Sequence, residues 1–519
     1  MTLEQKFWTE ETSYNNDNDN ERTALLTASQ NEQYATTPNQ DFRWLLKKGS
    51  SIAGTILLHQ MMELTNISMI GHLGARELAA ATLGNMLLAV VYYCIAGGIA
   101  NTMETLCSQA YTGAKDKTMV GVYFQRVYSV LIIWSILMGI VLYNGTSILI
   151  ALGQEPELAA FAGSYIRCIF PGAIIYVTFD AHRKYLQSQG ETIISVYILM
   201  IGVLMNALIQ YFLIFYLNMG FIGAPFGLSI VYIFMLGAQL FYTHFIRQTN
   251  INCWGGWSFR RCLPLKSNTA NKNGEWFQFF NLIICNVFVI CSEYYVAELS
   301  ILAISYLPNS TSIIASGSVL LRSHISSHTV AIGLAAASAT RVGHHIGQGS
   351  AQGARQSFHM GCWVSLLLSL PLTVFFWLFR DTFPYLFTEQ EDVAKLISTG
   401  LPLLASYQVF GMIAGQLSGV LRGFGRQQIS AFISLITFYG VTVPVGYTLI
   451  FHTSYWSLNG IWVAFGIGYF IYALAQLLFL FTVDWTAECA KIQNQLLLLH
   501  NSNDNHNITT LSVRKDYPV

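Results

Sequence analysis

The sequence contains few charged residues for its length. Only 10% of its 519 residues are Asp, Glu, Lys or Arg, whereas soluble domains carry roughly 25%. Lys and Arg together number 27, as do Asp and Glu, so the formal net charge is zero and no basic face is present that would bind a nucleic acid. Hydrophobic residues make up 53% of the chain. These values exclude an ordinary soluble domain and predict a polytopic protein that lies in the lipid bilayer.

Motifs for metal binding, redox chemistry and nucleotide hydrolysis are also missing. The nine Cys residues are scattered without the spacing of a zinc or redox site, so we expect reduced, packed thiols. No Walker motif (Gly-x-x-x-x-Gly-Lys-Ser/Thr) occurs, so ATP is not expected to be the direct energy source. We therefore predict no metal site and no cofactor. The first 40 residues are polar rather than a signal peptide, and the first helix is expected to insert as a signal anchor.

Long apolar segments recur along the chain, and each is long enough to cross a bilayer as a helix. They lie near residues 50–72, 79–102, 120–143, 157–178, 192–215, 221–245, 278–304, 313–338, 357–379, 397–420, 429–451 and 458–482. We expect twelve transmembrane helices, of which the eighth has the weakest apolar signal because it contains Arg322, His324 and His328. Lys and Arg are concentrated in alternate loops, which predicts that both termini are cytoplasmic.

The two halves of the chain resemble each other at an offset of about 235 residues. Leu186-Gln-Ser-Gln-Gly190 is similar to Leu421-Arg-Gly-Phe-Gly425, and Pro225-Phe226-Gly227 is similar to Ala464-Phe465-Gly466. Because six helices per half is an even number, both halves have the same orientation and are related by an axis along the membrane normal. Two such lobes facing each other form a cavity with a substrate site near the midplane, which favours a secondary transporter.

The predicted fold is an all-α membrane protein with twelve transmembrane helices in two six-helix lobes, related by an internal pseudo-two-fold axis. Five segments are expected along the chain. They are a disordered cytoplasmic tail (1–45), an N-lobe with helices 1–6 (46–246), a cytoplasmic inter-lobe loop (247–277), a C-lobe with helices 7–12 (278–484) and a second cytoplasmic tail (485–519).

Two carboxylates lie within the apolar segment near residues 280–307, namely Glu293 and Glu298. A charge at the centre of a spanning helix costs roughly 2.5–3.5 kcal/mol on insertion scales, so such residues usually face a bundle interior or a wet cavity. Five residues of helix correspond to about 500°, which places the carboxylates about 140° apart, where they flank a cavity but do not share one proton. Tyr294 and Tyr295 lie between them, and either offer ring faces to a cation or simply pack.

Three further polar sites lie in or near the predicted spans. Glu63 and Asn66 lie deep in the first helix, where they either bind substrate or form structural hydrogen bonds. His324 and His328 are one turn apart beside Arg322, and we interpret them as a polar cavity face because a metal site would need more ligands.

Six motifs occur in fixed order at the ends of the expected helices. They are Gly71-His-Leu-Gly-Ala-Arg-Glu-Leu-Ala-Ala80, Cys107-Ser-Gln-Ala-Tyr-Thr-Gly-Ala-Lys115, Tyr165-Ile-Arg-Cys-Ile-Phe-Pro171, Lys184-Tyr-Leu-Gln-Ser-Gln-Gly190, Thr340-Arg-Val-Gly-His-His-Ile-Gly-Gln-Gly349 and Val420-Leu-Arg-Gly-Phe-Gly-Arg-Gln427. Together they resemble the multidrug and toxin extrusion (MATE) family, in its eukaryotic branch and most like fungal members, over about residues 45–482.

The resemblance implies alternating access and export of organic cations or other amphipathic compounds in exchange for protons or sodium. Eukaryotic members carry a Cys-x-Glu motif in the seventh helix, followed by aromatic residues and a second Glu. Here that motif is Cys291-Ser-Glu293, followed by Tyr294, Tyr295 and Glu298. By resemblance, Glu293 and Glu298 bind the cation and the proton.

The sequence departs from the family at two positions. Animal members place further acidic residues in the eighth and tenth helices, and matching by the flanking motifs puts Arg322 and Gly411 at those positions. Because Arg322 reverses the charge of one site, it is expected either to form an ion pair with Glu298 or to bind an anionic group.

The predicted function is that of a secondary active antiporter, not an enzyme, that exports or sequesters organic cations, toxins or amphipathic metabolites in exchange for protons. Sodium-coupled efflux on the same fold and a lipid-linked-precursor flippase remain alternatives, as does a membrane acyltransferase, which would leave the repeat unexplained. Glu21-Arg-Thr-Ala-Leu25-Leu26 fits an acidic dileucine motif that a cytosolic sorting adaptor reads, so the location is either vacuolar or the plasma membrane. A monomer is the family default.

Overall fold

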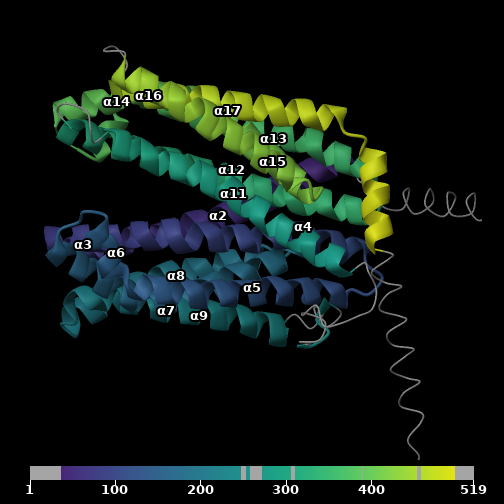
Figure 1. Ribbon diagram of the computed structural model, residues 1–519, viewed down its shortest axis with the longest axis horizontal. Helices are drawn as coiled ribbons and strands as arrows, with labels where there is room; N and C mark the ends of the chain where they lie inside the picture. The colour runs from purple at the N-terminus through teal and green to yellow at the C-terminus, as the bar shows by residue number, and fades with distance from the viewer. Residues whose placement is uncertain are drawn as a thin grey trace, which may run out of the picture.

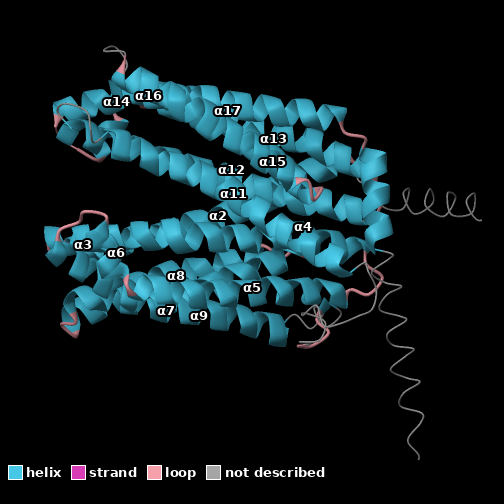
Figure 2. Cartoon of the chain, viewed as in Figure 1, coloured by secondary structure: helices cyan, strands magenta, loops and turns pink. Residues whose placement is uncertain are grey.

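The computed structural model describes residues 37–246, 253–257, 272–304, 310–388, 390–452 and 457–496. Within these residues every regular element is a helix, as Figure 2 shows. The predicted sorting motif at residues 21–26 lies outside the described residues.

The first half of the chain contains the helices of the predicted spans 1–6. They are α2 (Pro38–Gly71), α3 (Ala75–Leu88), the π-helical turn η1 (Ala89–Tyr93), α4 (Cys94–Gly113), α5 (Thr118–Tyr143), α6 (Gly145–Ala151), α7 (Pro156–Ser188), α8 (Ile193–Tyr211), η2 (Phe212–Tyr216), η3 (Gly220–Ile222), α9 (Gly223–Phe241) and η4 (Tyr242–Ile246).

The second half repeats this order. It consists of α11 (Lys272–Ile304), α12 (Ser310–Gly347), α13 (Ala351–Leu378), η6 (Phe383–Leu386), α14 (Glu391–Gly423), α15 (Gln427–Leu435), the π-helical turn η7 (Ile436–Thr442), α16 (Val443–Phe451) and α17 (Ser457–Thr482). In both halves a π-helical turn interrupts one long helix, η1 between α3 and α4 and η7 between α15 and α16, and such turns often mark functional positions.

Ten helices of the described chain are long and apolar enough to cross a membrane by length and composition. The predicted first and eighth spans correspond to α2 and α12, which have 34 and 38 residues but fall outside that group. Their polar residues have a structural reason, because α12 packs against α2, α4, α13 and α14 rather than against lipid alone. A helix inside the protein keeps polar groups that a lipid-facing helix excludes.

Figure 1 shows two bundles of helices, one formed by α2–α9 and the other by α11–α17. Each has its own hydrophobic core, although Phe279 and Ile283 at the start of α11 join the core of the first bundle. The bundles pack against each other through α2 with α12 and through α4 with α11 and α12. This arrangement agrees with two lobes, whereas the predicted bounds of the five segments stay a prediction.

One end of the molecule holds both ends of the described chain, and we call it the terminal side. There α2 begins with a capping box in which Thr37 and Gln40 satisfy each other's backbone amides, and Pro38 opens the helix. Ordered helix therefore starts within the segment that was expected to be a tail. A second helix, residues 485–496, also lies there, and its Gln493 donates to the carbonyl oxygens of Ile346 and Gly347 at the end of α12.

Asp41 explains why α2 extends so far. Its carboxylate is fully buried and accepts two hydrogen bonds from the Arg341 guanidinium of α12, at 2.8 and 2.5 Å. Its second oxygen accepts hydrogen bonds from Gln356 and Ser357 of α13, at 2.8 and 3.2 Å. A buried charge with four donors is fully compensated, and it fastens the first helix to the second bundle.

Replacing Asp41 by Asn should therefore destabilise the protein, because it leaves the Arg341 charge buried without its partner. Breaking a buried ion pair costs about 3–5 kcal/mol. We expect a clearly lower unfolding temperature for Asp41→Asn, measured by intrinsic fluorescence of the purified protein in detergent. Asp381→Asn is the matched control, because that side chain is 75% exposed beside Arg380 and should leave the unfolding temperature nearly unchanged. Equal unfolding temperatures for the two variants would contradict this account of Asp41.

Candidate functional site

Glu293 lies on α11 where that helix faces α12 and α17. Its Oε1 accepts a hydrogen bond from the Tyr469 hydroxyl at 2.5 Å, and the Nε2 of His328 lies 2.9 Å from the same oxygen. The side chain of Glu293 is nevertheless 26% exposed. The carboxylate is thus held by two partners while one part of it still faces accessible space, as a group that binds an ion or a proton must.

A layer of aromatic rings fixes the direction of the Tyr469 hydroxyl. The two ring nitrogens of His324 lie 3.2 Å from the Tyr407 hydroxyl and 3.4 Å from that of Tyr469. The Tyr407 ring stacks on the Tyr469 ring at 5.8 Å between centroids, and Phe438 of η7 packs on it edge-on at 5.5 Å. Because these contacts come from α12, α14 and η7, four elements besides α11 position the partners of Glu293.

A second carboxylate lies in the other bundle. Glu63 of α2 accepts a hydrogen bond from the Tyr232 hydroxyl of α9 at 3.2 Å, and the Nε2 of His59 lies 3.9 Å from it. The His59 ring stacks on Tyr176 of α7 at 4.2 Å, and the Tyr176 and Tyr232 rings are 5.0 Å apart. The side chain of Glu63 is 30% exposed. Each bundle therefore contains one partly exposed carboxylate surrounded by Tyr and His.

The internal repeat relates these two clusters. Glu63 corresponds to Glu293, each on the first helix of its half, and the spacing along the chain is close to the repeat offset of about 235 residues. Two tyrosines obey the same relation: Tyr176 and Tyr407 lie on the fourth helices, α7 and α14, and Tyr232 and Tyr469 on the sixth helices, α9 and α17. The two acidic clusters are thus structural equivalents.

The other predicted residues are placed differently. Tyr295 donates to the carbonyl oxygen of Val90 in η1 at 2.8 Å, and Asn66 is fully buried and donates to the Tyr165 hydroxyl at 2.8 Å. Both therefore join helices, and their predicted part in binding stays a prediction. Tyr294 interacts with Glu298 on the same helix.

Arg322 is exposed on α12. It lies near enough to Glu63 of α2 and to Tyr294 of α11 to interact with them electrostatically. The expected ion pair with Glu298 is not formed, since no ion pair of Arg322 occurs among the residues that the structure describes. The partial exposure of Glu63, Glu293 and Arg322 defines an accessible space between α2, α11 and α12, which we call the inter-lobe cavity.

The two bundles are closed against each other on the terminal side. Glu104 of α4 is buried between Lys184 of α7 at 3.4 Å and Arg422 of α14 at 3.6 Å, so one carboxylate joins cations of both bundles. The Thr105 hydroxyl donates to the carbonyl oxygen of Arg422 at 2.8 Å, and the Gln109 amide donates to that of Gly423 at 2.7 Å. These contacts close one end of the inter-lobe cavity, and the bundles separate toward the other end (Figure 1).

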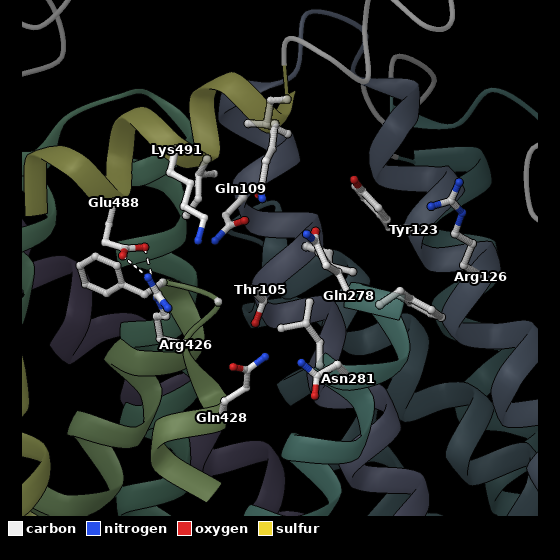
Figure 3. A pocket seen from close by; sticks show the side chains of 18 residues that line it. Thr105, Gln109, Tyr123, Arg126, Gln278, Asn281, Arg426, Gln428, Glu488 and Lys491 are labelled. Carbon is white, nitrogen blue, oxygen red and sulfur yellow. Dashed lines mark hydrogen bonds and ion pairs between the residues drawn. The ribbon is translucent and has the colours of Figure 1, made fainter. Parts of the chain in front are cut away.

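A pocket of about 460 Å³ lies beside this closure, between α4, α5, α11 and the helix 485–496. Figure 3 shows its polar lining, with the Arg426–Glu488 ion pair on one wall, and Lys491, Gln109 and Gln278 around it. Neither acidic cluster contributes a residue to this pocket. It is therefore a separate feature of the terminal side and not the site that the carboxylates form.

An all-helical membrane protein with two repeated halves and an acidic cluster in each has the form of a polytopic transporter. A family model described as MatE matches residues 51–212 and matches again at residues 286–448, once in each half. The chain belongs to this multidrug and toxin extrusion (MATE) family, which confirms the resemblance and makes the protein a transporter rather than an enzyme.

Relatives from fungi, animals and plants agree with this assignment. An uncharacterized transporter of Schizosaccharomyces pombe is 31% identical over 85% of this chain and 79% of that protein. Multidrug and toxin extrusion protein 2 of Mus musculus is 28% identical over 85% of this chain and 76% of that protein. Protein DETOXIFICATION 39 of Arabidopsis thaliana is 31% identical over 82% of this chain and 81% of that protein.

Solved structures show the same fold. The eukaryotic MATE transporter AtDTX14 superposes with a TM-score of 0.78 over 88% of this chain and 99% of that chain, at 22% identity. The MATE transporter VcmN of Vibrio cholerae gives a TM-score of 0.76 over 86% of this chain and 99% of that chain, at 16% identity. The predicted all-α fold of twelve helices is confirmed.

Sequence reasoning named Glu63 and Glu293 but missed the tyrosines that bind them. Tyr232 and Tyr469 lie far along the chain from their carboxylates, and a single Tyr in an apolar helix carries no signal of its own. The internal repeat was the signal that identifies them, because both tyrosines occupy equivalent positions in the two halves. His324 and His328, expected as a polar cavity face, lie in the Glu293 cluster.

Removing the Glu104 charge should loosen the closure on the terminal side, because Lys184 and Arg422 then lie together without an anion. Losing hydrogen bonds to a charged group costs about 1.5–3 kcal/mol, so we expect the population with separated terminal ends to rise about tenfold or more in Glu104→Gln. Spin labels on the exposed positions Lys115 and Arg355, in a background without accessible thiols, measure the distance across the closure.

Glu157→Gln is the control for this experiment, because Glu157 pairs with Arg76 at the opposite end of the molecule. The control should keep the wild-type distance distribution. A wild-type distribution in Glu104→Gln as well would mean that this carboxylate does not hold the bundles together.

Proposed function

We propose that the protein is an antiporter that moves organic cations, toxins or amphipathic metabolites across a membrane in exchange for protons. The observation that carries the proposal is Glu293, a carboxylate at membrane depth that is held by Tyr469 and His328 yet remains partly exposed to the inter-lobe cavity. An ionised carboxylate attracts a cation, and a protonated one does not. A proton and a cationic substrate therefore compete for the same charge.

Exchange also requires two states that differ in affinity and in the side to which the cavity opens. In the state described by the structure, Glu104, Thr105 and Gln109 close the terminal side, while the bundles separate at the other end. Protonation of Glu293 in this state releases the substrate to the far side. Opening of the terminal side then exposes the carboxylate to the compartment from which the next substrate is taken.

Glu63 supports the same mechanism in the first bundle. It has an equivalent Tyr partner and a similar exposure, so it supplies a second negative charge to the cavity. Two carboxylates, one on each bundle, explain how movement of the bundles and binding of charge are linked, because separation of the bundles changes the distance between the two charges. Glu298 remains a further predicted binding residue of α11.

The proposed orientation has both termini in the cytoplasm, so that substrate leaves the cytoplasm for the outside or for the lumen of a vacuole. The dileucine motif favours the vacuole, and we expect its replacement by Ala at Leu25 and Leu26 to move the protein to the plasma membrane. A single chain carries both acidic clusters, which supports function as a monomer.

Proton release from proteoliposomes tests the proposal. Tetraethylammonium added to vesicles that contain the wild-type protein should cause proton movement reported by a pH-sensitive dye, because binding of the cation displaces protons. Glu293→Gln should lose at least nine-tenths of this signal. Tyr469→Phe should weaken the apparent affinity about tenfold, because a hydrogen bond to a charged group contributes about 1.5–3 kcal/mol. Tyr472→Phe is its control, since the Tyr472 hydroxyl lies beside Ser430 instead.

The outcomes separate the alternatives. Transport that follows a sodium gradient and not a proton gradient would replace the proton by sodium in the same scheme. Wild-type proton release in Glu293→Gln would contradict the role assigned to this residue. Glu157→Gln, an exposed carboxylate outside the cavity, should behave as the wild type does.

A further inference from the structure

The guanidinium of Arg322 is a positive charge in a cavity whose proposed task is to bind cations. It lies on α12 within the predicted eighth span, and its side chain is exposed. Its electrostatic neighbours are Glu63 on one bundle and Tyr294 on the other, so it faces the space between the bundles. Placing an Arg at membrane depth is costly, and a wet cavity is where such a residue is tolerated.

The exposed face of α12 leads into the same space. Ser318, Arg322 and Ser326 are exposed and recur every four residues, which places them on one side of the helix. On the next turns of that side Thr329 is buried, and its hydroxyl accepts a hydrogen bond from Gln60 of α2 at 2.8 Å. That contact forms the floor of the cavity, and Arg322 lies above it, away from the terminal side.

Arg322 forms no ion pair or hydrogen bond with another residue that the structure describes. A guanidinium presents five N–H donors in a planar fork that matches the two oxygens of a carboxylate. Glu63 is near but already accepts the Tyr232 hydroxyl at 3.2 Å, and it does not reach the guanidinium. The donors of Arg322 are thus directed to accessible space that contains both a negative and a positive side.

We propose that Arg322 binds an anionic group of the substrate, and that the transported compounds include zwitterions with an organic cation and a carboxylate. This inference rests on the proposed function, because the cationic part is bound by the Glu293 cluster. Arg322 precedes His328, the partner of Glu293, by six residues, which is about 9 Å along the helix. The arm of the arginine shortens that separation to one that a small zwitterion spans.

A pair of matched probes tests the inference. L-carnitine carries a trimethylammonium group and a carboxylate, and its methyl ester carries the same cation without the negative charge. In wild-type proteoliposomes we expect a lower KM for carnitine than for the ester. In Arg322→Gln the KM for carnitine should rise tenfold or more, while that for the ester changes less than twofold. Arg322→Lys should lie between, because it keeps the charge and loses the fork.

Ser326→Ala is the control on the same face of α12, and it should leave both KM values unchanged. The unfolding temperature of Arg322→Gln establishes that the variant is folded; if it is not, competition between carnitine and the ester for the wild-type protein gives the same comparison.

Two results overturn the inference. Equal KM values of the two probes for the wild type, or an equal change of both in Arg322→Gln, would show that Arg322 does not bind the carboxylate. Proton release by the ester without any transport of carnitine would also overturn it and would leave the antiport proposal intact. If neither probe nor tetraethylammonium releases protons, the proposed function fails, and this inference fails with it.

Discussion

A carboxylate at membrane depth requires donors that hold its charge and water that reaches it, and this requirement shapes the whole molecule. Glu293 and Glu63 both receive a tyrosine hydroxyl from the sixth helix of their own half, and both remain partly exposed. Neither condition is met by one helix in lipid. Each bundle has to bring its first, fourth and sixth helices together around the acid, and the two bundles have to stay apart where the acids face each other.

The terminal side solves the opposite problem. There Asp41 and Glu104 are buried completely or almost completely, and each is compensated by cations or donors of the second bundle. Charges that join the bundles are thus dry and paired, whereas charges that face the cavity are accessible and only partly satisfied. A transporter that alternates between two states needs both kinds, because the paired contacts close one end while the accessible groups exchange their ligands.

Much of this could be predicted from the sequence. Twelve apolar segments and a repeat at a fixed offset predicted the fold, since bilayer thickness and chain symmetry act on every helix. Glu63 and Glu293 were found because a carboxylate in an apolar helix needs a reason. Tyr469 and Tyr407 were not found as binding partners, because their contacts depend on how α14 and α17 pack against α11. The ion pair expected between Arg322 and Glu298 is absent from the described residues, because Arg322 faces α2 instead.

Competition between a proton and the substrate for Glu293 is the central claim, and the pH dependence of substrate affinity tests it most directly. The Kd of tetraethylammonium for the purified protein should rise about tenfold for each unit that the pH falls below the titration of the carboxylate, because each bound proton excludes one cation. In Glu293→Gln the Kd should be high and nearly independent of pH. The same steep pH dependence in Glu293→Gln as in the wild type would contradict the account, because the proton would then bind elsewhere.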